Sequence, residues 1–247
     1  MTPTLETIAT YFVRVAPGLV LGAMMLFLAR REARLRIVLY LALFVLLRDA
    51  LTPLGLWSFG TQGFFWIRLH SDPWFLVAFG VACLGLSLGL YYFDRGNRPI
   101  FRWTRGSLPL GLLCGVGGAV AVVAPLVVAY QFTPIESRGG QVPSGNIPAI
   151  LLFALLGNLL EEALFRGYVY GQLAQTMTPV KAGIASGVVF AFCHIYLATT
   201  VTGAGYPLLV FTLWEGILAG LVGAKGGVLP STLTHGGAIF LLSSGLI

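Results

Sequence analysis

Apolar stretches of about 20 residues, separated by short polar connections, run along the whole chain. A helix of that length spans the hydrocarbon core of a bilayer, which is roughly 30 Å thick. The pattern therefore predicts an all-α fold, a polytopic transmembrane helical bundle of about eight spans. The last two are short and could also form one broken hairpin. We expect the spans at residues 8–29, 37–56, 73–93, 107–130, 147–170, 182–200, 207–223 and 228–246.

Composition supports a membrane protein, because 57% of the residues are hydrophobic and only 10% are charged. Soluble domains carry about 25% charged residues. The net charge of +6 does not indicate a nucleic-acid partner, since the arginines cluster in alternate connections. By the positive-inside rule, this bias places both termini outside. The Arg-rich composition suits the bacterial plasma (inner) membrane. The arginines that set the orientation are Arg30, Arg31, Arg34, Arg36, Arg95, Arg98, Arg102 and Arg105.

The chain divides at a connection rich in proline and glycine, residues 131–146. Residues 1–140 form about four N-terminal transmembrane helices with little chemistry, which we interpret as accessory. Residues 147–247 hold nearly all the polar groups that lie within spans. The connection 57–72 is aromatic and suits an interfacial belt; its aromatic residues include Trp57, Phe59, Phe64, Phe65 and Trp66.

The fifth span holds two adjacent acids, Glu161 and Glu162, followed by Arg166. An ionised side chain at the centre of a membrane helix costs roughly 2.5–3.5 kcal/mol. Glu162 and Arg166 are four residues apart and share a helix face, whereas Glu161 lies about 140° around the axis from Arg166. One acid would be held structurally while the other is left to react. Asn158 could bond to either acid. The alternative interpretation is an ion-pair network that pins helix packing.

Later spans add further polar groups. Phe190 precedes His194 by four residues in the sixth span, and His235 lies in the eighth. We expect both histidines and Glu161 to converge on one pocket. Glu215, in the seventh span, could line the substrate path or bond to a neighbouring helix. Arg48 and its neighbour lie near a span end, where snorkelling or local pairing accounts for them.

These groups suit acyl hydrolysis. A buried glutamate can act as general base toward water. One histidine would orient that water, and the other would donate a hydrogen bond to the oxyanion. Glu161, His194 and His235 also match a ligand set for catalytic zinc. Because the three come from separate spans, without a His-Glu-x-x-His helix, we expect neither a metal nor another cofactor.

The pattern Glu161-Glu162-x-x-x-Arg166, then Phe190-x-x-x-His194, then His235 resembles the CAAX-prenyl-protease and bacteriocin-processing family, CPBP or Abi. Its members are intramembrane endopeptidases with about eight helices, generally regarded as glutamate-dependent. The resemblance covers roughly residues 147–243 and implies that residues 147–247 are the catalytic core. It further implies that Glu161 activates water, Glu162 is a partner acid tied to Arg166, His194 positions the water and His235 serves the oxyanion.

The chain departs from this family at Ile239, where Asn or Asp is frequent. If that side chain normally stabilises the oxyanion, its loss would cost roughly 10²–10³ in rate. Asn158 or Thr234 could substitute as a donor.

The leading hypothesis is an intramembrane endopeptidase acting on a membrane-anchored protein or peptide that carries a lipid, a leader or a sorting segment. One alternative is a non-catalytic membrane immunity or scaffold protein. Another is a small transporter or proton relay, since buried acids also mark ion paths. The sequence defines no oligomeric state.

Overall fold

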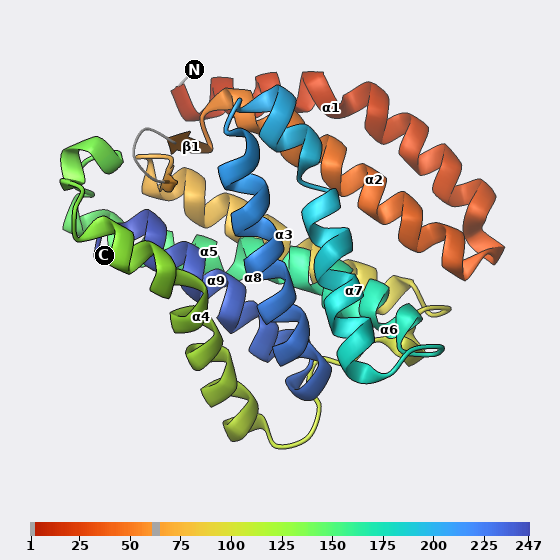
Figure 1. Cartoon of the computed structure of the whole chain (residues 1–247). Coiled ribbons are helices and arrows are strands. Elements are labelled where there is room, and N and C mark those ends of the chain that lie inside the picture. Colours follow the sequence, from red (N-terminus) through yellow and green to blue (C-terminus); the bar gives the residue numbers. More distant parts are fainter. Residues whose placement is uncertain (1–2, 61–64) are drawn as a thin grey trace.

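A computed structural model describes residues 3–60 and 65–247, and within them the chain is a bundle of helices with one small hairpin (Figure 1). Phe64 of the aromatic connection lies outside the described residues. The helices are α1 (Pro3–Leu28), α2 (Ala33–Leu51), α3 (Pro73–Phe93), α4 (Leu108–Tyr130), α5 (Ile147–Glu162), α6 (Tyr170–Leu173), α7 (Pro179–Phe192), α8 (Gly205–Gly226) and α9 (Val228–Ser244), with π-helical segments η6 (Ala163–Val169) and η7 (Leu197–Val201). Short 3-10 turns are η1 (Ala29–Arg31), η2 (Thr52–Leu54), η3 (Arg98–Ile100), η4 (Ile135–Arg138) and η5 (Ser144–Asn146).

The predicted polytopic all-α bundle is confirmed. Within the described part of the chain, seven helices are long and apolar enough to cross a membrane. The eighth predicted span, 228–246, forms the 17-residue helix α9, which is not one of these seven. It packs against α4, α5 and α8, so most of its surface is covered by protein. The chain is an integral membrane protein.

The two C-terminal helices α8 and α9 form a hairpin, as the alternative prediction had it, because the chain turns between them at Gly227. This glycine has φ +91°, and a Cβ there would approach the carbonyl oxygens of Arg102 and Trp103 to 2.9 Å. A side chain is therefore excluded by both conformation and space. The turn lets α9 return beside α8 and brings His235 back toward the middle of the bundle.

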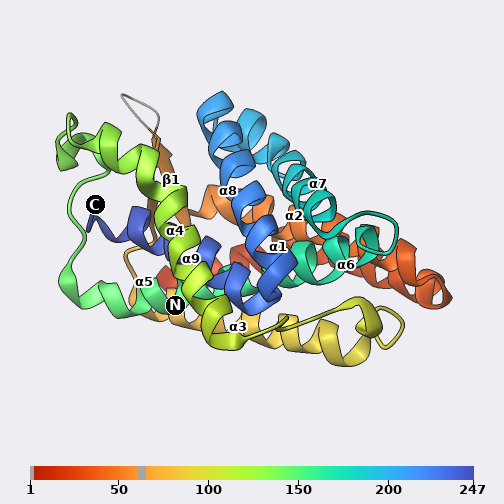
Figure 2. The same cartoon turned by 60° about the horizontal axis from the view of Figure 1, so that its bottom comes forward.

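The connection after α2 contains an antiparallel hairpin that the all-α prediction did not include. Strand β1 (Trp57–Gly60) pairs with β2 (Trp66–Leu69), with Trp57 opposite Leu69. Aromatic residues favour strands. The aromatic side chains of residues 57–72, which predicted an interfacial belt, are therefore also compatible with a hairpin. Arg68 donates to the carbonyls of Gly140 at 3.1 Å and Leu242 at 2.7 Å. These bonds tie the hairpin, the α4–α5 connection and the C-terminal end together, and the three lie at one end of the bundle in both views (Figures 1 and 2).

Helices α7 and α8 make the most extensive contact in the bundle. Glycines spaced by four line both faces, so the backbones meet directly: a Cβ at Gly220 would lie 2.2 Å from the Gly183 carbonyl oxygen, and one at Gly187 would lie 2.6 Å from that of Gly216. Small residues at this spacing are typical of close helix packing in membranes. The approach matters for function because α7 leads into His194 and α8 carries Glu215.

Candidate active site

The predicted pairing of Glu162 with Arg166 is present. Arg166 Nη1 donates to Glu162 Oε1 at 2.8 Å, and the two residues are 1% and 0% exposed. Arg166 Nη2 donates to the Gly216 carbonyl on α8 at 2.6 Å. The arginine therefore connects the end of α5 to α8. Arg166 lies in the π-helical segment η6, which continues α5, and such segments are frequent at functional sites.

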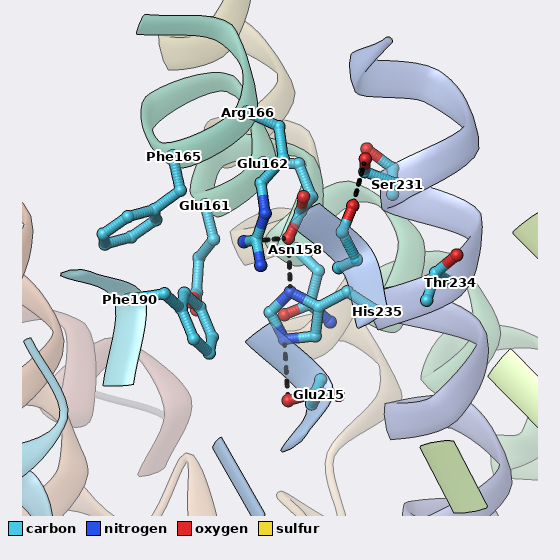
Figure 3. A network of polar contacts seen from close by, with 12 residues as sticks. Asn158, Glu161, Glu162, Phe165, Arg166, Phe190, Glu215, Ser231, Thr234 and His235 are labelled. Atoms are coloured by element: carbon cyan, nitrogen blue, oxygen red, sulfur yellow. Dashed lines mark hydrogen bonds and ion pairs between the residues drawn. The ribbon is translucent and has the colours of Figure 1, made fainter. Parts of the chain in front are cut away.

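His235 joins this pair to a third acid. Its Nδ1 lies 2.9 Å from Glu162 Oε1, and its Nε2 lies 3.5 Å from Glu215 Oε2. Figure 3 shows Arg166, Glu162, His235 and Glu215 as one continuous line of contacts. Of the two interpretations open for Glu215, the structure supports a bond to a neighbouring helix, and the residue also lines the cavity described below.

Glu161 is not part of this line and faces His194 instead. The distance from Glu161 Oε2 to His194 Nε2 is 4.0 Å, too long for a hydrogen bond. The other ring nitrogen, Nδ1, is 2.8 Å from the Phe190 carbonyl. A carbonyl can only accept, so Nδ1 carries the proton and Nε2 of the neutral ring is an acceptor. Two acceptors, one carboxylate oxygen and one imidazole nitrogen, thus face each other across a small gap.

Phe190 packs between the two histidines. Its ring centroid lies 4.4 Å from that of His194 and 5.2 Å from that of His235, and the Arg166 guanidinium sits 4.9 Å from its ring centroid. The aromatic residue therefore fixes both imidazoles laterally while its carbonyl fixes the tautomer of His194.

Two expected donors are committed elsewhere. Asn158 bonds to neither glutamate, because its amide donates to the Ala154 carbonyl one turn earlier at 2.6 Å. Thr234 donates to the carbonyls of Gly115 and Pro230, both at 3.2 Å. An i to i−4 bond to the helix backbone is a local alternative that such side chains commonly take.

Arg48 lies in the last turn of α2 and pairs with Asp49, as the local-pairing interpretation expected, but its side chain does not snorkel. It is only 5% exposed, and it lines the same cavity as Glu161 and His194. Its Nε donates to Asp49 Oδ1 at 2.8 Å and its Nη2 to the Cys193 carbonyl at 2.7 Å. The site therefore contains a second guanidinium, and the sequence carried one signal of it: an ion pair placed inside an apolar stretch.

A cavity of about 830 Å³ connects these groups. Its walls are mainly apolar side chains of α1, α2, α3 and the hairpin, whereas its polar lining includes Glu161, His194, Glu215 and His235. The size is that of a pocket for a drug-sized ligand or a short peptide segment. An apolar chamber with a few convergent polar groups is the usual form of a binding or active site.

The zinc alternative requires Glu161, His194 and His235 to converge on one point. They do not, because both ring nitrogens of His235 face carboxylates. In residues 3–60 and 65–247, no group of three His, Cys, Asp or Glu side chains is arranged to hold a metal ion. The residues present do not fit a zinc site of this composition.

Residues 143–241 match the family model for type II CAAX prenyl endopeptidase Rce1-like proteins. The chain contains an Rce1-like domain. The resemblance to the CAAX-protease and bacteriocin-processing family is thereby confirmed, and it supports a CAAX-type intramembrane protease in general. No curated protein and no solved structure matches the chain. Glu161, His194 and His235 fall within the Rce1-like domain, and Arg48 falls outside it.

Proposed function

We propose that the protein is a glutamate-dependent intramembrane endopeptidase that hydrolyses a peptide bond of a membrane-tethered protein or peptide. The observation that carries this proposal is the facing pair of acceptors, Glu161 Oε2 and His194 Nε2, 4.0 Å apart beside an apolar cavity. A water molecule between them would donate one hydrogen to each. Its lone pair would then be free to attack a carbonyl carbon.

The reaction follows from these positions. The water oxygen bonds to the carbonyl carbon as Glu161 takes one of its protons, and the carbonyl π electrons move to oxygen. The tetrahedral intermediate then collapses, the C–N bond breaks, and Glu161 returns the proton to the leaving nitrogen. The products are a carboxylic acid and an amine. His194 orients the water and does not itself change charge.

Glu162 and Arg166 support this reaction without touching the water. Their ion pair fixes the end of α5, from which Glu161 projects, and Glu162 also holds His235. Arg166 neutralises the neighbouring acid, so that Glu161 is not required to ionise beside an uncompensated negative charge.

The cavity supports a substrate with an apolar portion, such as a lipidated protein, a leader peptide or a sorting segment. Aromatic and aliphatic side chains of α1 to α3 would hold that portion while the peptide bond reaches Glu161. The arginine-rich composition favours a location in the bacterial plasma membrane. The arginine-rich connections would then lie inside and both termini outside.

The test compares purified wild-type protein, Glu161→Gln and a control, Glu136→Gln, in lipid nanodiscs with candidate membrane-anchored peptides. Glu136 is an exposed acid in η4 that does not line the cavity. Mass spectrometry should find cleavage products with wild type and Glu136→Gln but none with Glu161→Gln. Equal cleavage by Glu161→Gln would refute the proposal. A biological effect that survives in Glu161→Gln would instead favour the non-catalytic alternative.

A further inference from the structure

An oxyanion forming in this cavity needs a hydrogen-bond donor. Apart from His235, the side chains expected to supply it from the Rce1-like domain are engaged or apolar. Ile239 has no polar atom, Asn158 donates to its own helix, and Thr234 donates to backbone carbonyls. Nε2 of His235 lies 3.5 Å from a carboxylate oxygen of Glu215, which is longer than a typical hydrogen bond, so this nitrogen is one candidate donor. A second donor would have to come from elsewhere in the cavity wall.

Arg48 has such a donor. Among the described residues its Nη1 has no hydrogen-bond partner, although the atom is buried. The other two nitrogens are held by Asp49 and by the Cys193 carbonyl. Because a guanidinium is planar, these two contacts fix the direction of Nη1. A buried N–H without a partner is costly and calls for an explanation.

Arg48 is also close to the reacting groups. The carbonyl it binds belongs to the residue immediately before His194. Arg48 lines the same cavity as Glu161 and His194, and its ion pair is with Asp49, not with Glu161. Arg48 and Glu161 thus border the same cavity without being paired with each other, as a donor and a base acting on one carbonyl would.

We propose that Arg48 is a catalytic residue whose Nη1–H donates a hydrogen bond to the oxyanion formed when Glu161-activated water adds to the scissile carbonyl. The inference rests on the proposed function. Arg48 transfers no proton, because a guanidinium stays protonated in proteins. It stabilises the charge on the former carbonyl oxygen until the C–N bond breaks. Loss of one such donor lowers kcat by about 10²–10³-fold in other enzymes.

The experiment separates binding of the oxyanion from binding of the substrate. One probe is a cleavable membrane-anchored peptide, and the other is its phosphinate analogue, in which a tetrahedral anionic phosphorus replaces the scissile carbonyl carbon. Arg48→Gln should lower kcat/KM by about 10²–10³-fold and weaken phosphinate binding by a similar factor. Affinity for the intact peptide, measured in the Glu161→Gln background, should change less than about threefold. Transition-state stabilisation predicts this split.

The matched control is Arg68→Gln. Arg68 is another buried arginine bound to backbone carbonyls, but it does not line the cavity. Its loss should lower thermal stability without changing the ratio of phosphinate to substrate affinity. If Arg48→Gln does not fold, Arg48→Lys replaces it in the experiment. Lysine keeps the positive charge but lacks the planar guanidinium, so this variant should weaken phosphinate binding more than substrate binding.

Equal weakening of both probes, or an unchanged phosphinate affinity, would overturn the assignment of Arg48. Phosphinate binding requires no turnover, so this result is separate from the test of Glu161. Cleavage by Glu161→Gln would refute the proposed base whatever Arg48→Gln does. A selective loss of phosphinate affinity in Arg48→Gln would still establish the donor.

Discussion

Nδ1 of His235 lies 2.9 Å from Oε1 of Glu162. Its Nε2 faces a second carboxylate, Glu215, at 3.5 Å, so the imidazole is held between acids from two different helices. Such an arrangement orients the ring from both sides. We therefore regard Glu215 as a positioning residue that acts on the reaction through His235.

Replacing Glu215 by Gln should lower kcat by about 10–100-fold, by analogy with the loss of partners that orient metal-binding histidines. The amide keeps the size of the side chain but removes its charge, so the imidazole loses one of its two anionic partners. KM should change little, and the pH profile of kcat should shift, which a purely structural role would not cause. Steady-state kinetics across pH measures both.

Thr212→Val is the control for Glu215. Thr212 lies on α8 and lines the same cavity, but its hydroxyl donates to the Leu209 carbonyl of its own helix. We expect near-wild-type kcat and an unchanged pH profile. An identical loss in both variants would mean that α8 has moved and that Glu215 has no specific role.

Loss of the Glu162–Arg166 ion pair should lower the stability of the fold more than it changes substrate affinity. Arg166→Met leaves a buried carboxylate without its guanidinium, and breaking a buried pair in this way costs about 3–5 kcal/mol. The double variant Glu162→Gln with Arg166→Met removes both charges and should recover much of the lost thermal stability in detergent. It should still be inactive, because Glu161 and His235 lose their support. A double variant as unstable as the single one would contradict the ion-pair explanation.

The sequence predicted the spans and the Glu162–Arg166 bond because apolar length, helical periodicity and charge in an apolar stretch are local signals. The extent of the Rce1-like domain followed from the family resemblance. The sequence did not predict the aromatic hairpin or the contacts of Asn158, since short strands and side-chain rotamers depend on tertiary packing. The position of Arg48 in the cavity wall was not predicted, for the same reason. Its partner carbonyl at Cys193 lies 145 residues away, and nothing near Arg48 in the chain indicates that contact.

Removing metal ions should leave activity unchanged. Only Glu161 and His194 face one another across the gap, and His235 is turned to its own carboxylates, so three ligands for zinc do not converge. We expect full cleavage after treatment with 1,10-phenanthroline and less than one zinc per chain by elemental analysis. Inhibition that is reversed by added zinc would instead require a rearranged site with a third ligand.

The connection after α3 should make folding sensitive to acid through Asp94. Burial raises the pKa of this carboxyl. Hydrogen bonds act in the opposite direction, and they come from Arg36 at 2.5 Å, Asn97 at 2.7 Å and Tyr40 at 2.9 Å. Together these bonds outweigh burial and hold the pKa of Asp94 below its usual value. A lowered pKa stabilises the fold above the usual carboxyl range, near pH 4, and this contribution is lost as pH falls through the folded-state pKa.

Asp94→Asn removes that contribution. Wild type should have the higher Tm by several degrees at pH 5–8, and the difference should shrink as pH falls below about 4. Thermal unfolding in detergent at a series of pH values measures it. A difference that stays constant to pH 3 would mean that the charge of Asp94 is not what stabilises the connection.

The close approach of α7 and α8 leads to the last prediction, that Gly220→Ala impairs both stability and catalysis. The new Cβ would lie 2.2 Å from the Gly183 carbonyl oxygen, so the two helices must separate. Overpacking of this kind costs roughly 1–3 kcal/mol. Separation also moves the Gly216 carbonyl away from Arg166, which it binds at 2.6 Å.

Gly117→Ala on α4 distinguishes packing from backbone propensity. A Cβ at Gly117 would meet no atom within 4 Å, so alanine there should maintain or raise the Tm, since it favours helices by about 1 kcal/mol over glycine. Activity should be unchanged. If Gly220→Ala behaved in the same way, the glycine contact between α7 and α8 would not be what sets the distance between His194 and Glu215.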